Sequence, residues 1–359
     1  MPENLRFDAP HLVRAIKAII AAGGSADAEA QHVAASLVES NLQGHDSHGI
    51  GMVPRYVAAI LDGGLVANQQ PRITLDLGTL ITVDGQRGYG QVIGDAAMGI
   101  AISRAREGGS CVMALANSHH LGRIGQFAQL AVAEGLVSIH FVNVLSRPMV
   151  GAWGGSDARF GTNPCCIGIP QAGEPAMILD FATSMIAQGK LRVAHNQGAP
   201  VKPGVLLDDQ GDPTTDPRFA VVEPLGAILP FGEHKGYGLA IACELLGGAL
   251  TGGGTEHGAK LPDSRVLNGM LSILIDPRRL GTAEAFARDS GAFLSWLRKS
   301  RPGPGVDRVR IPGEPERESR ARRLAEGVPV DATTWREISG AAARLGIKKD
   351  AIDALARDT

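Results

Sequence analysis

Residues 165–182 read CCIGIPQAGEPAMILDFA and hold two short apolar runs close together in the chain. We expect CCIGIP (165–170) and AMILDFA (176–182) to form two successive strands. Strands that follow each other so closely favour a mixed sheet, because a wholly parallel sheet needs a long crossover between neighbouring strands. The stretch therefore predicts an α/β fold with a mixed sheet.

Helix and strand patterns alternate on both sides of this stretch, as is typical of α/β proteins. The helical patterns are DAAMGIAISRAREGG (95–109), GRIGQFAQLAVAEG (122–135) and HKGYGLAIACELLGGAL (234–250). The further strand patterns are SCVMALA (110–116), LVSIHFVNV (136–144) and MLSILIDP (270–277). RITLDLGTLITVDG (72–85) predicts a hairpin broken at Gly78.

Both ends of the chain have helical patterns. A helix over residues 10–22 should stop at Gly23 and Gly24, and a second helix, capped by Ser25, should end at Gly44. Residues 301–318 predict a Pro/Gly-rich connection, after which two more helices close the chain. We expect the two terminal segments to pack together as one helical layer.

Composition excludes several classes of protein. Among 359 residues, 35 are basic and 37 acidic, which argues against a general nucleic-acid binder because such binding needs many Lys and Arg contacts to phosphates. The four cysteines form no CxxC pair, so neither a disulfide framework nor a zinc pattern is predicted. No signal region and no run of roughly 20 apolar residues occurs, so we expect a cytoplasmic protein that does not enter the membrane.

Two glycine-rich stretches imitate the dinucleotide fingerprint G-x-G-x-x-G without matching it. Gly88, Gly90 and Gly94 have one residue too many, and Gly236 and Gly238 are followed by Ile241 where the third glycine should be. Turns and helix packing are the commoner use of such glycines. GEHKGYG (232–238) fits an anion site at the start of a helix or an ordinary first turn about equally well.

Three polar stretches follow predicted elements: GHDSHG (44–49), NSHHLG (117–122) and DFATS (180–184). HDSH supplies too few ligands for a convincing metal site, so none is predicted. Two separate loops that carry Ser and His favour an active site with two imidazoles, which exchange protons near neutral pH. A Ser/His hydrolase stays open, although the G-x-S-x-G elbow is missing.

Seven ordered motifs resemble the malate/L-lactate/ureidoglycolate dehydrogenase family, which is unrelated to the Rossmann lactate dehydrogenases. They are DSHGIGMVPRYV (46–57), NSHHLGRIG (117–125), AWGGSDARFGTNP (152–164), DFATS (180–184), GDPTTDP (211–217), GEHKGYGL (232–239) and PGEPE (312–316). The resemblance implies an NAD- or NADP-dependent oxidoreductase of 2-hydroxy and 2-oxo acids, active as a homodimer. It also implies a largely antiparallel, non-Rossmann cofactor domain over residues 69–314 and a helical domain from residues 1–68 and 315–359.

The resemblance also assigns roles to residues. His120, the second histidine of NSHHLG, matches the acid/base imidazole, and Ser47, His48 and Tyr56 match residues that line the nicotinamide and substrate pocket. Cofactor contacts are expected from His48, Gly122, Arg123, Ile124, Ile178, Leu179, Asp180, Phe181, Ala182, His234, Lys235, Asn268, Gly313, Glu314, Pro315 and Glu316. Asn268 and the Gly313–Glu316 turn are expected in flexible loops.

One departure from the family concerns the substrate. Many members carry an arginine four residues after the histidine of SHG, and this chain has Met52 there. Methionine cannot pair with a carboxylate as an arginine fork does. Another cation is therefore needed, with Arg55, Arg123 and Arg147 as candidates and Arg147 as the first choice. Met52 should make the pocket more apolar, which favours bulky or aromatic 2-oxo acids.

Three questions stay open in the sequence. The substrate is a 2-oxo acid or, as for similar family members, a cyclic imine carboxylate, while a nucleotide-binding protein without catalytic activity is the remaining alternative. The Arg-rich run from Arg301 to Arg323 fits a 2′-phosphate site or, more commonly, a solvated helix face, since acids alternate with it. The preference between NAD and NADP is therefore undecided.

Overall fold

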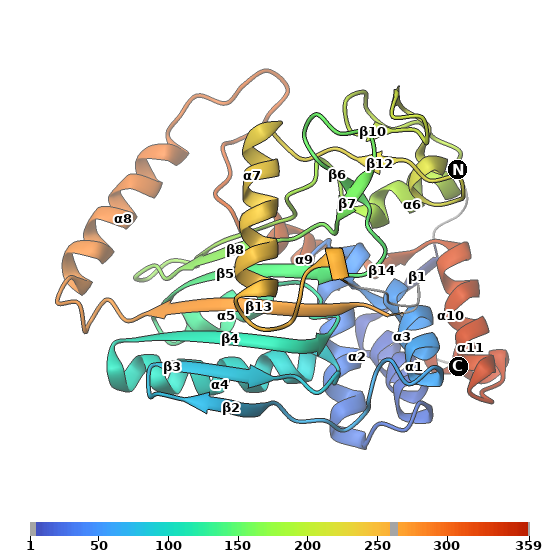
Figure 1. The fold of residues 1–359 in the computed structure, drawn as a ribbon, viewed down its shortest axis with the longest axis horizontal. Coiled ribbons are helices and arrows are strands. Elements are labelled where there is room, and N and C mark those ends of the chain that lie inside the picture. Colours follow the sequence, from blue (N-terminus) through green and yellow to red (C-terminus); the bar gives the residue numbers. More distant parts are fainter. Residues whose placement is uncertain (1–4, 259–264, 358–359) are drawn as a thin grey trace.

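The computed structural model describes residues 5–258 and 265–357, so parts of all three predicted domain ranges (1–4, 259–264 and 358–359) lie outside it. A seven-stranded sheet in the order β2-β3-β4-β13-β5-β8-β9 forms its centre (Figure 1). Its strands are β2 (Arg72–Asp76), β3 (Leu80–Asp84), β4 (Ser110–His119), β5 (Val137–Leu145), β8 (Cys165–Ile169), β9 (Met177–Phe181) and β13 (Leu267–Ile275).

The predicted mixed, largely antiparallel sheet is confirmed. Only β3 and β4 pair in parallel, and every other neighbouring pair in this sheet is antiparallel. The two runs of residues 165–182 form the hairpin β8–β9, with Cys165 opposite Phe181. The predicted hairpin β2–β3 is also present, and Gly78 turns it with a φ of 79°, a conformation that costs glycine little.

Helices cover both faces of the large sheet. α4 (Gly90–Gly108) and α5 (Gly125–Ala133) pack on one face, and α7 (His234–Cys243) with the π-helical segment Glu244–Ala249 packs on the other (Figure 1). Apolar residues of α4, α5 and the strands form a buried cluster that includes Met98, Phe127 and Met270. This packing holds the strand ends that carry the polar stretches.

The two chain ends form one helical layer, as predicted. Leu5 of β1 (Leu5–Phe7) pairs with Val330 of β14 (Val328–Val330), and α1 contacts α11. Their shared core includes Leu12, Ile16 and Ile338. The helices are α1 (Ala9–Ala22), α2 (Asp27–Leu42), α3 (Val53–Leu61), α9 (Glu314–Glu326), α10 (Ala332–Arg344) and α11 (Lys349–Ala356).

The helix boundaries correct two expectations. Ser25 does not cap α2: Ala26 precedes the helix, and its N–H donates to Asn68 Oδ1 at 2.7 Å, so a residue distant in the chain replaces the local cap. Three helices rather than two follow residue 301, because α9 begins at Glu314, inside the predicted connection. Pro315 does not interrupt α9, since the first turn of a helix has no partner for that N–H. Gly44, with a φ of 86°, follows the end of α2 as expected.

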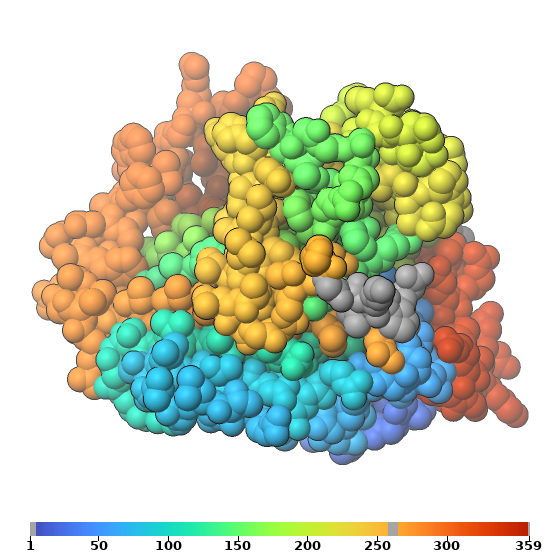
Figure 2. Space-filling model, viewed as in Figure 1, coloured from blue at the N-terminus to red at the C-terminus, as the bar shows by residue number. Residues whose placement is uncertain are grey.

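Two further parts were not anticipated from the sequence. A small sheet in the order β11-β10-β12-β6-β7 has its own buried cluster with Val150, Phe160 and Leu206, and α6 (Gln188–Asn196) contributes Leu191 to it. Its strands are β6 (Val150–Gly151), β7 (Ala158–Phe160), β10 (Leu206–Leu207), β11 (Pro213–Thr214) and β12 (Ala227–Ile228). The helix α8 (Ala283–Arg298) projects beyond the large sheet (Figures 1 and 2). In the described part of the chain, no helix is long and apolar enough to span a bilayer.

Candidate active site

The centre of the site is the His120 imidazole, directly after the end of β4. His120 Nδ1 lies 2.8 Å from the Tyr56 hydroxyl oxygen, and His120 Nε2 lies 3.2 Å from His48 Nδ1. The His48 and His120 rings are stacked, with centroids 5.4 Å apart. Residues from three separate segments therefore meet at one buried imidazole: η1 (Asp46–His48), α3 and the loop after β4.

Tyr56 is held from two sides. It is fully buried in α3, its hydroxyl accepts a hydrogen bond from Gln91 Nε2 at 2.7 Å, and its ring packs edge-on against Tyr89 and His119. Burial raises the Tyr56 pKa, so the hydroxyl stays protonated at neutral pH. Gln91, in α4, was not singled out in the sequence, although it follows directly the glycines of the failed fingerprint.

Burial also keeps both imidazoles neutral in the free protein. The pKa of His48 falls to about 4, mainly through burial and then through His45 and Arg123. The pKa of His120 lies well below its ordinary value, again mainly through burial and then through His48, His119 and Arg55. A neutral imidazole has one N–H donor and one acceptor nitrogen, so the hydrogen bonds of Tyr56 and His48 decide which nitrogen of His120 carries the proton.

The expected cofactor segments converge beside this centre. Asp180 Oδ2 of β9 accepts a hydrogen bond from the Gly125 N–H at 2.7 Å, and Ile178 N–H donates to Pro312 O at 3.2 Å. His45 Nε2 lies 3.3 Å from Glu316 Oε1, which joins the SHG segment to the start of α9. Residues 122–125, 178–182 and 312–316 therefore form one neighbourhood next to His48.

The backbone in this neighbourhood suits a bound dinucleotide. Gly122 and Gly313 have φ values of 81° and 95°, and a Cβ at Gly313 would lie 3.2 Å from Ile178 N. Such close, unobstructed backbone is what a pyrophosphate requires, here without the Rossmann fingerprint. Gly122, Arg123 and Ile124 precede α5, which begins at Gly125 rather than at the predicted residue 122.

Asn268 is not in a loop, which corrects that expectation. It lies in the central strand β13, where Asn268 Oδ1 accepts from Leu121 N–H at 2.8 Å and Nδ2 donates to Asn143 O at 2.8 Å. Because both ends of the amide are bonded to protein, Asn268 orients the loop that carries His120. Glu314, Pro315 and Glu316 likewise lie in the first turn of α9 and not in a flexible turn.

His234 and Lys235 begin α7, as expected, and both are exposed. The His234 ring lies 5.6 Å from the Trp153 ring. Phe231, three residues before, packs edge-on against Phe181 at 5.7 Å, which connects this loop to the end of β9. Within the described ranges the Lys235 side chain has no ion-pair partner.

The candidate substrate cations differ in availability. Arg123 is buried and donates to Gln129 Oε1 at 2.6 Å, whereas the half-buried Arg147 guanidinium, after β5, has no bond to another described residue. The structure adds Arg192 of α6, whose Nη2 lies 3.0 Å from the position of a Cβ on Gly51. Arg192 is held only loosely, by Glu337 at 3.7 Å. Met52 packs against the helical core.

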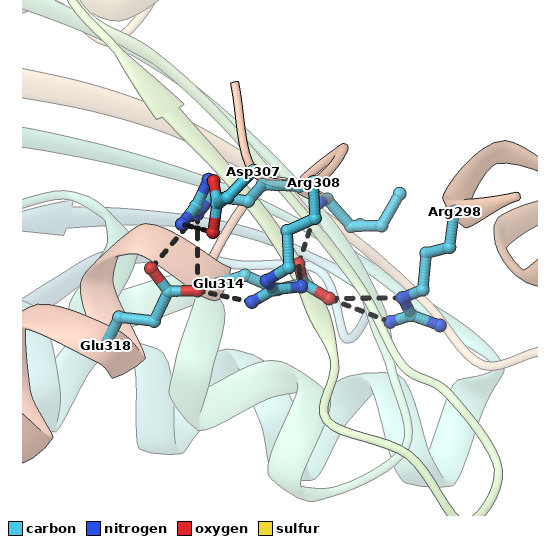
Figure 3. Close-up of polar contacts among 7 residues, drawn as sticks. Arg298, Asp307, Arg308, Glu314 and Glu318 are labelled. Atoms are coloured by element: carbon cyan, nitrogen blue, oxygen red, sulfur yellow. Dashed lines mark hydrogen bonds and ion pairs between the residues drawn. The ribbon is translucent and has the colours of Figure 1, made fainter. Parts of the chain in front are cut away.

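The arginines before α9 are already paired with carboxylates (Figure 3). Glu314 accepts from Arg298 at 3.1 Å and from Arg308 at 2.9 Å, while Glu318 accepts from Arg308 and Arg310. These side chains border a cavity of about 410 Å³, whose lining is Glu174, Pro175, Arg298, Arg308, Glu314, Arg317 and Glu318. Charges of both signs alternate around it, as the sequence predicted.

No group of three or more His, Cys, Asp or Glu side chains in the described ranges is arranged to hold a metal ion. The acid/base chemistry available at this site therefore rests on His120, His48 and Tyr56.

Comparison with known proteins agrees with this site. The malate/L-lactate dehydrogenase family matches residues 7–339. Hydroxycarboxylate dehydrogenase B of Escherichia coli O157:H7 is 44% identical over 357 residues, which cover 99% of this chain and 98% of that protein. A solved E. coli structure of the malate/lactate dehydrogenase type superposes with a TM-score of 0.93 at 43% identity and covers 98% of both chains. The solved delta1-piperideine-2-carboxylate reductase of Pseudomonas syringae has a TM-score of 0.81 at 30% identity, over 94% of this chain and 99% of that one.

The fold and the site are those of a dehydrogenase that acts on 2-hydroxy acids, a class that uses a nicotinamide cofactor. Within this class, the chain belongs to the malate/L-lactate dehydrogenase family. The resemblance inferred from the seven motifs is thereby confirmed.

Proposed function

We propose that this enzyme interconverts a 2-oxo acid with a bulky apolar or aromatic side chain and the corresponding 2-hydroxy acid, with His120 as the acid/base group. The observation that carries the proposal is the buried His120 imidazole, bonded to Tyr56 and in contact with His48. When bound, the nicotinamide supplies or accepts the hydride at the substrate carbon. In reduction, His120 Nε2 gives its proton to the carbonyl oxygen, and one proton from solvent restores the imidazole.

The remaining site residues orient and enclose the reactants. Ser47 and His48 line the pocket, and α6 closes against this segment, because a Cβ on Gly189 would lie 2.6 Å from Ser47 Cβ. Residues 122–124, 178–182, 234–235 and 313–316, with Asn268 beneath them, hold the cofactor. Exclusion of water strengthens each charge interaction with the substrate.

A turnover assay tests the proposal. Loss of NADH or NADPH absorbance is followed with pyruvate, oxaloacetate, phenylpyruvate, 4-hydroxyphenylpyruvate and a cyclic imine carboxylate. His120→Gln should lower kcat at least 100-fold, which is the upper part of the contribution of a general acid or base, and should leave the cofactor Kd nearly unchanged. The matched control is His257→Gln, at an exposed histidine. Unchanged turnover in His120→Gln would remove this histidine from its role.

The cyclic imine carboxylate is the second candidate substrate. The likeness to delta1-piperideine-2-carboxylate reductase favours it, since an imine nitrogen takes a proton in the same place as a carbonyl oxygen. A higher kcat/KM for the imine than for every 2-oxo acid would replace the leading proposal. Silence on the whole panel would favour the nucleotide-binding protein without catalytic activity.

We further propose that Arg147 binds the substrate carboxylate in place of the arginine that Met52 replaces. Its guanidinium is unpaired among the described residues, and it follows β5 directly. Arg192 is the competing candidate, because it lies beside Gly51, next to Met52. Arg147→Met should raise KM for the 2-oxo acid roughly tenfold or more, since a charge-assisted pair contributes more than about 1.4 kcal/mol. A rise in KM in Arg192→Met and not in Arg147→Met would transfer the role to Arg192.

We propose NAD as the preferred cofactor. Glu314 and Glu318 occupy the guanidiniums of Arg298, Arg308 and Arg310, so a 2′-phosphate in the neighbouring cavity would have to displace carboxylates. The ratio of kcat/KM for NADH to that for NADPH tests this preference directly. A ratio below one would refute it.

We propose that the enzyme is a cytoplasmic homodimer. Four buried, unpaired cysteines suit a reducing compartment. The face that projects from the large sheet exposes apolar side chains, with Phe293 at 55% and Trp296 at 68% on α8 and Leu245 at 52% beside α7. A second copy would remove these rings from water. Analytical ultracentrifugation should find a dimer in the wild type and a monomer in Phe293→Glu/Trp296→Glu; a wild-type monomer would refute the proposal.

A further inference from the structure

Gln91 ends the hydrogen-bond chain Gln91–Tyr56–His120–His48 on the side away from His48. The side chain is 2% exposed, and its Nε2 donates to the Tyr56 hydroxyl at 2.7 Å. Its Oε1 is buried and has no hydrogen-bond partner among the described residues. Buried amide oxygens normally accept a hydrogen bond, so an unpartnered one calls for a physical explanation.

The amide of Gln91 can face Tyr56 in two ways. The oxygen and nitrogen of a glutamine amide have nearly the same shape, and half a turn about the last side-chain bond exchanges them. In either orientation the amide makes one hydrogen bond, to Tyr56, and its other end stays unpartnered. The two orientations therefore differ little in hydrogen-bond energy and differ mainly in the direction of the Tyr56 O–H.

The direction of that O–H decides what His120 can hold. When Gln91 presents N–H, the Tyr56 hydroxyl donates to His120 Nδ1, and the proton of the neutral ring lies on Nε2. When Gln91 presents C=O, Tyr56 donates to Gln91 and accepts from an Nδ1–H of His120. Only the second arrangement supports the protonated imidazole, which carries N–H on both nitrogens.

We propose that Gln91 is a positioning residue that lets His120 gain and lose its proton, because its amide accepts either direction of the Tyr56 hydroxyl. This inference rests on the proposed acid/base role of His120. Gly122 leaves room for the arrangement, since a Cβ there would lie 3.3 Å from Gln91 Nε2. The titratable or charged groups that face His120 and Tyr56 are His48 from η1, Arg55 from α3, His119 from β4 and Tyr89 beside α4.

Two substitutions separate the two directions. Gln91→Met keeps the length of the side chain and removes its donor and acceptor, so Tyr56 can donate only to His120 Nδ1. The protonated imidazole then loses its support, and its pKa falls. Gln91→Glu keeps the shape and adds a carboxyl group, which accepts from Tyr56 when ionised and both donates and accepts when protonated. The pKa of His120 should then rise or stay unchanged.

The experiment is the pH profile of kcat for reduction of the best 2-oxo acid, together with the thermal midpoint of each variant. In Gln91→Met, the alkaline limb should move to lower pH by about one unit and kcat should fall roughly tenfold, with KM nearly unchanged. In Gln91→Glu, the limb should move to higher pH or stay in place. The control is Gln126→Met, which removes an amide bonded to Asp95 at 2.7 Å, outside the chain.

An unshifted limb in Gln91→Met, or a shift to lower pH in Gln91→Glu, would overturn the inference, even if both variants were less stable. A lower thermal midpoint alone would indicate only packing. Failure of the proposed function is distinguished by His120→Gln: if that variant keeps full turnover, the role of His120 is wrong. If it is inactive while Gln91→Met keeps the wild-type profile, only the role of Gln91 is wrong.

Discussion

Tyr56→Phe tests the hydrogen bond on which the geometry of the site depends. The substitution removes one oxygen atom and leaves the buried ring in place. Two hydrogen bonds are lost, at 2.8 Å to His120 Nδ1 and at 2.7 Å from Gln91 Nε2. Because both partners are buried, neither regains its bond from bulk water.

The expected magnitude follows from these two bonds. A buried polar group left without a partner costs about 1–3 kcal/mol, so the free energy of unfolding should fall by about that amount. A hydrogen bond to a group that becomes charged contributes about 1.5–3 kcal/mol, which corresponds to a loss in kcat of roughly 10- to 100-fold. KM for the 2-oxo acid should change little, since Tyr56 acts through His120 and not on the substrate carboxylate.

The assay is steady-state reduction followed by loss of NADH absorbance, with urea unfolding of the same preparations. Tyr89→Phe is the matched control, because that hydroxyl belongs to a neighbouring buried ring and has no hydrogen bond to His120. A kcat within twofold of the wild type in Tyr56→Phe, with the stability loss still present, would refute the catalytic reasoning and leave Tyr56 a structural residue.

Three further predictions concern other parts of the molecule. Gly122→Ala should raise the KM for the cofactor several-fold, because its φ of 81° costs a residue with a side chain about 1–2 kcal/mol, whereas Gly99→Ala, in open space on α4, should not; equal cofactor KM values would contradict this. Burial lowers the pKa of His140 to about 3, so stability should fall as the pH drops from the ordinary histidine value of 6.5 towards 3, and His140→Asn should reduce the slope by up to about 1.4 kcal/mol per pH unit, measured by urea unfolding at several pH values; an unchanged slope would be inconsistent with a neutral buried ring. Glu318→Gln should raise kcat/KM for NADPH relative to NADH several-fold by releasing Arg308 and Arg310, and a constant ratio would show that these arginines lie outside the cofactor site.

Local patterns in the sequence determined much of the fold. The apolar runs of residues 165–182 became the hairpin β8–β9, the helical pattern of residues 10–22 became α1, and Gly44 ended α2. These features depend on neighbours in the chain, since side-chain period and left-handed glycines act over a few residues. The seven motifs identified the family for the same reason, because each is a short stretch that can be read by itself.

Only the tertiary structure decided how those stretches meet. It placed Tyr56, His48 and Gln91 around His120, moved Asn268 from an expected loop into β13, and began α9 inside a segment rich in Pro and Gly. Hydrogen bonds such as those of Gln91 with Tyr56 and Ala26 with Asn68 join residues 35 and 42 positions apart, and no local pattern encodes them. The sequence by itself determined which chemical groups this enzyme has. The packing of α3, α4 and β4 against one another determined which of these groups touch, because burial there excludes water and leaves only protein partners.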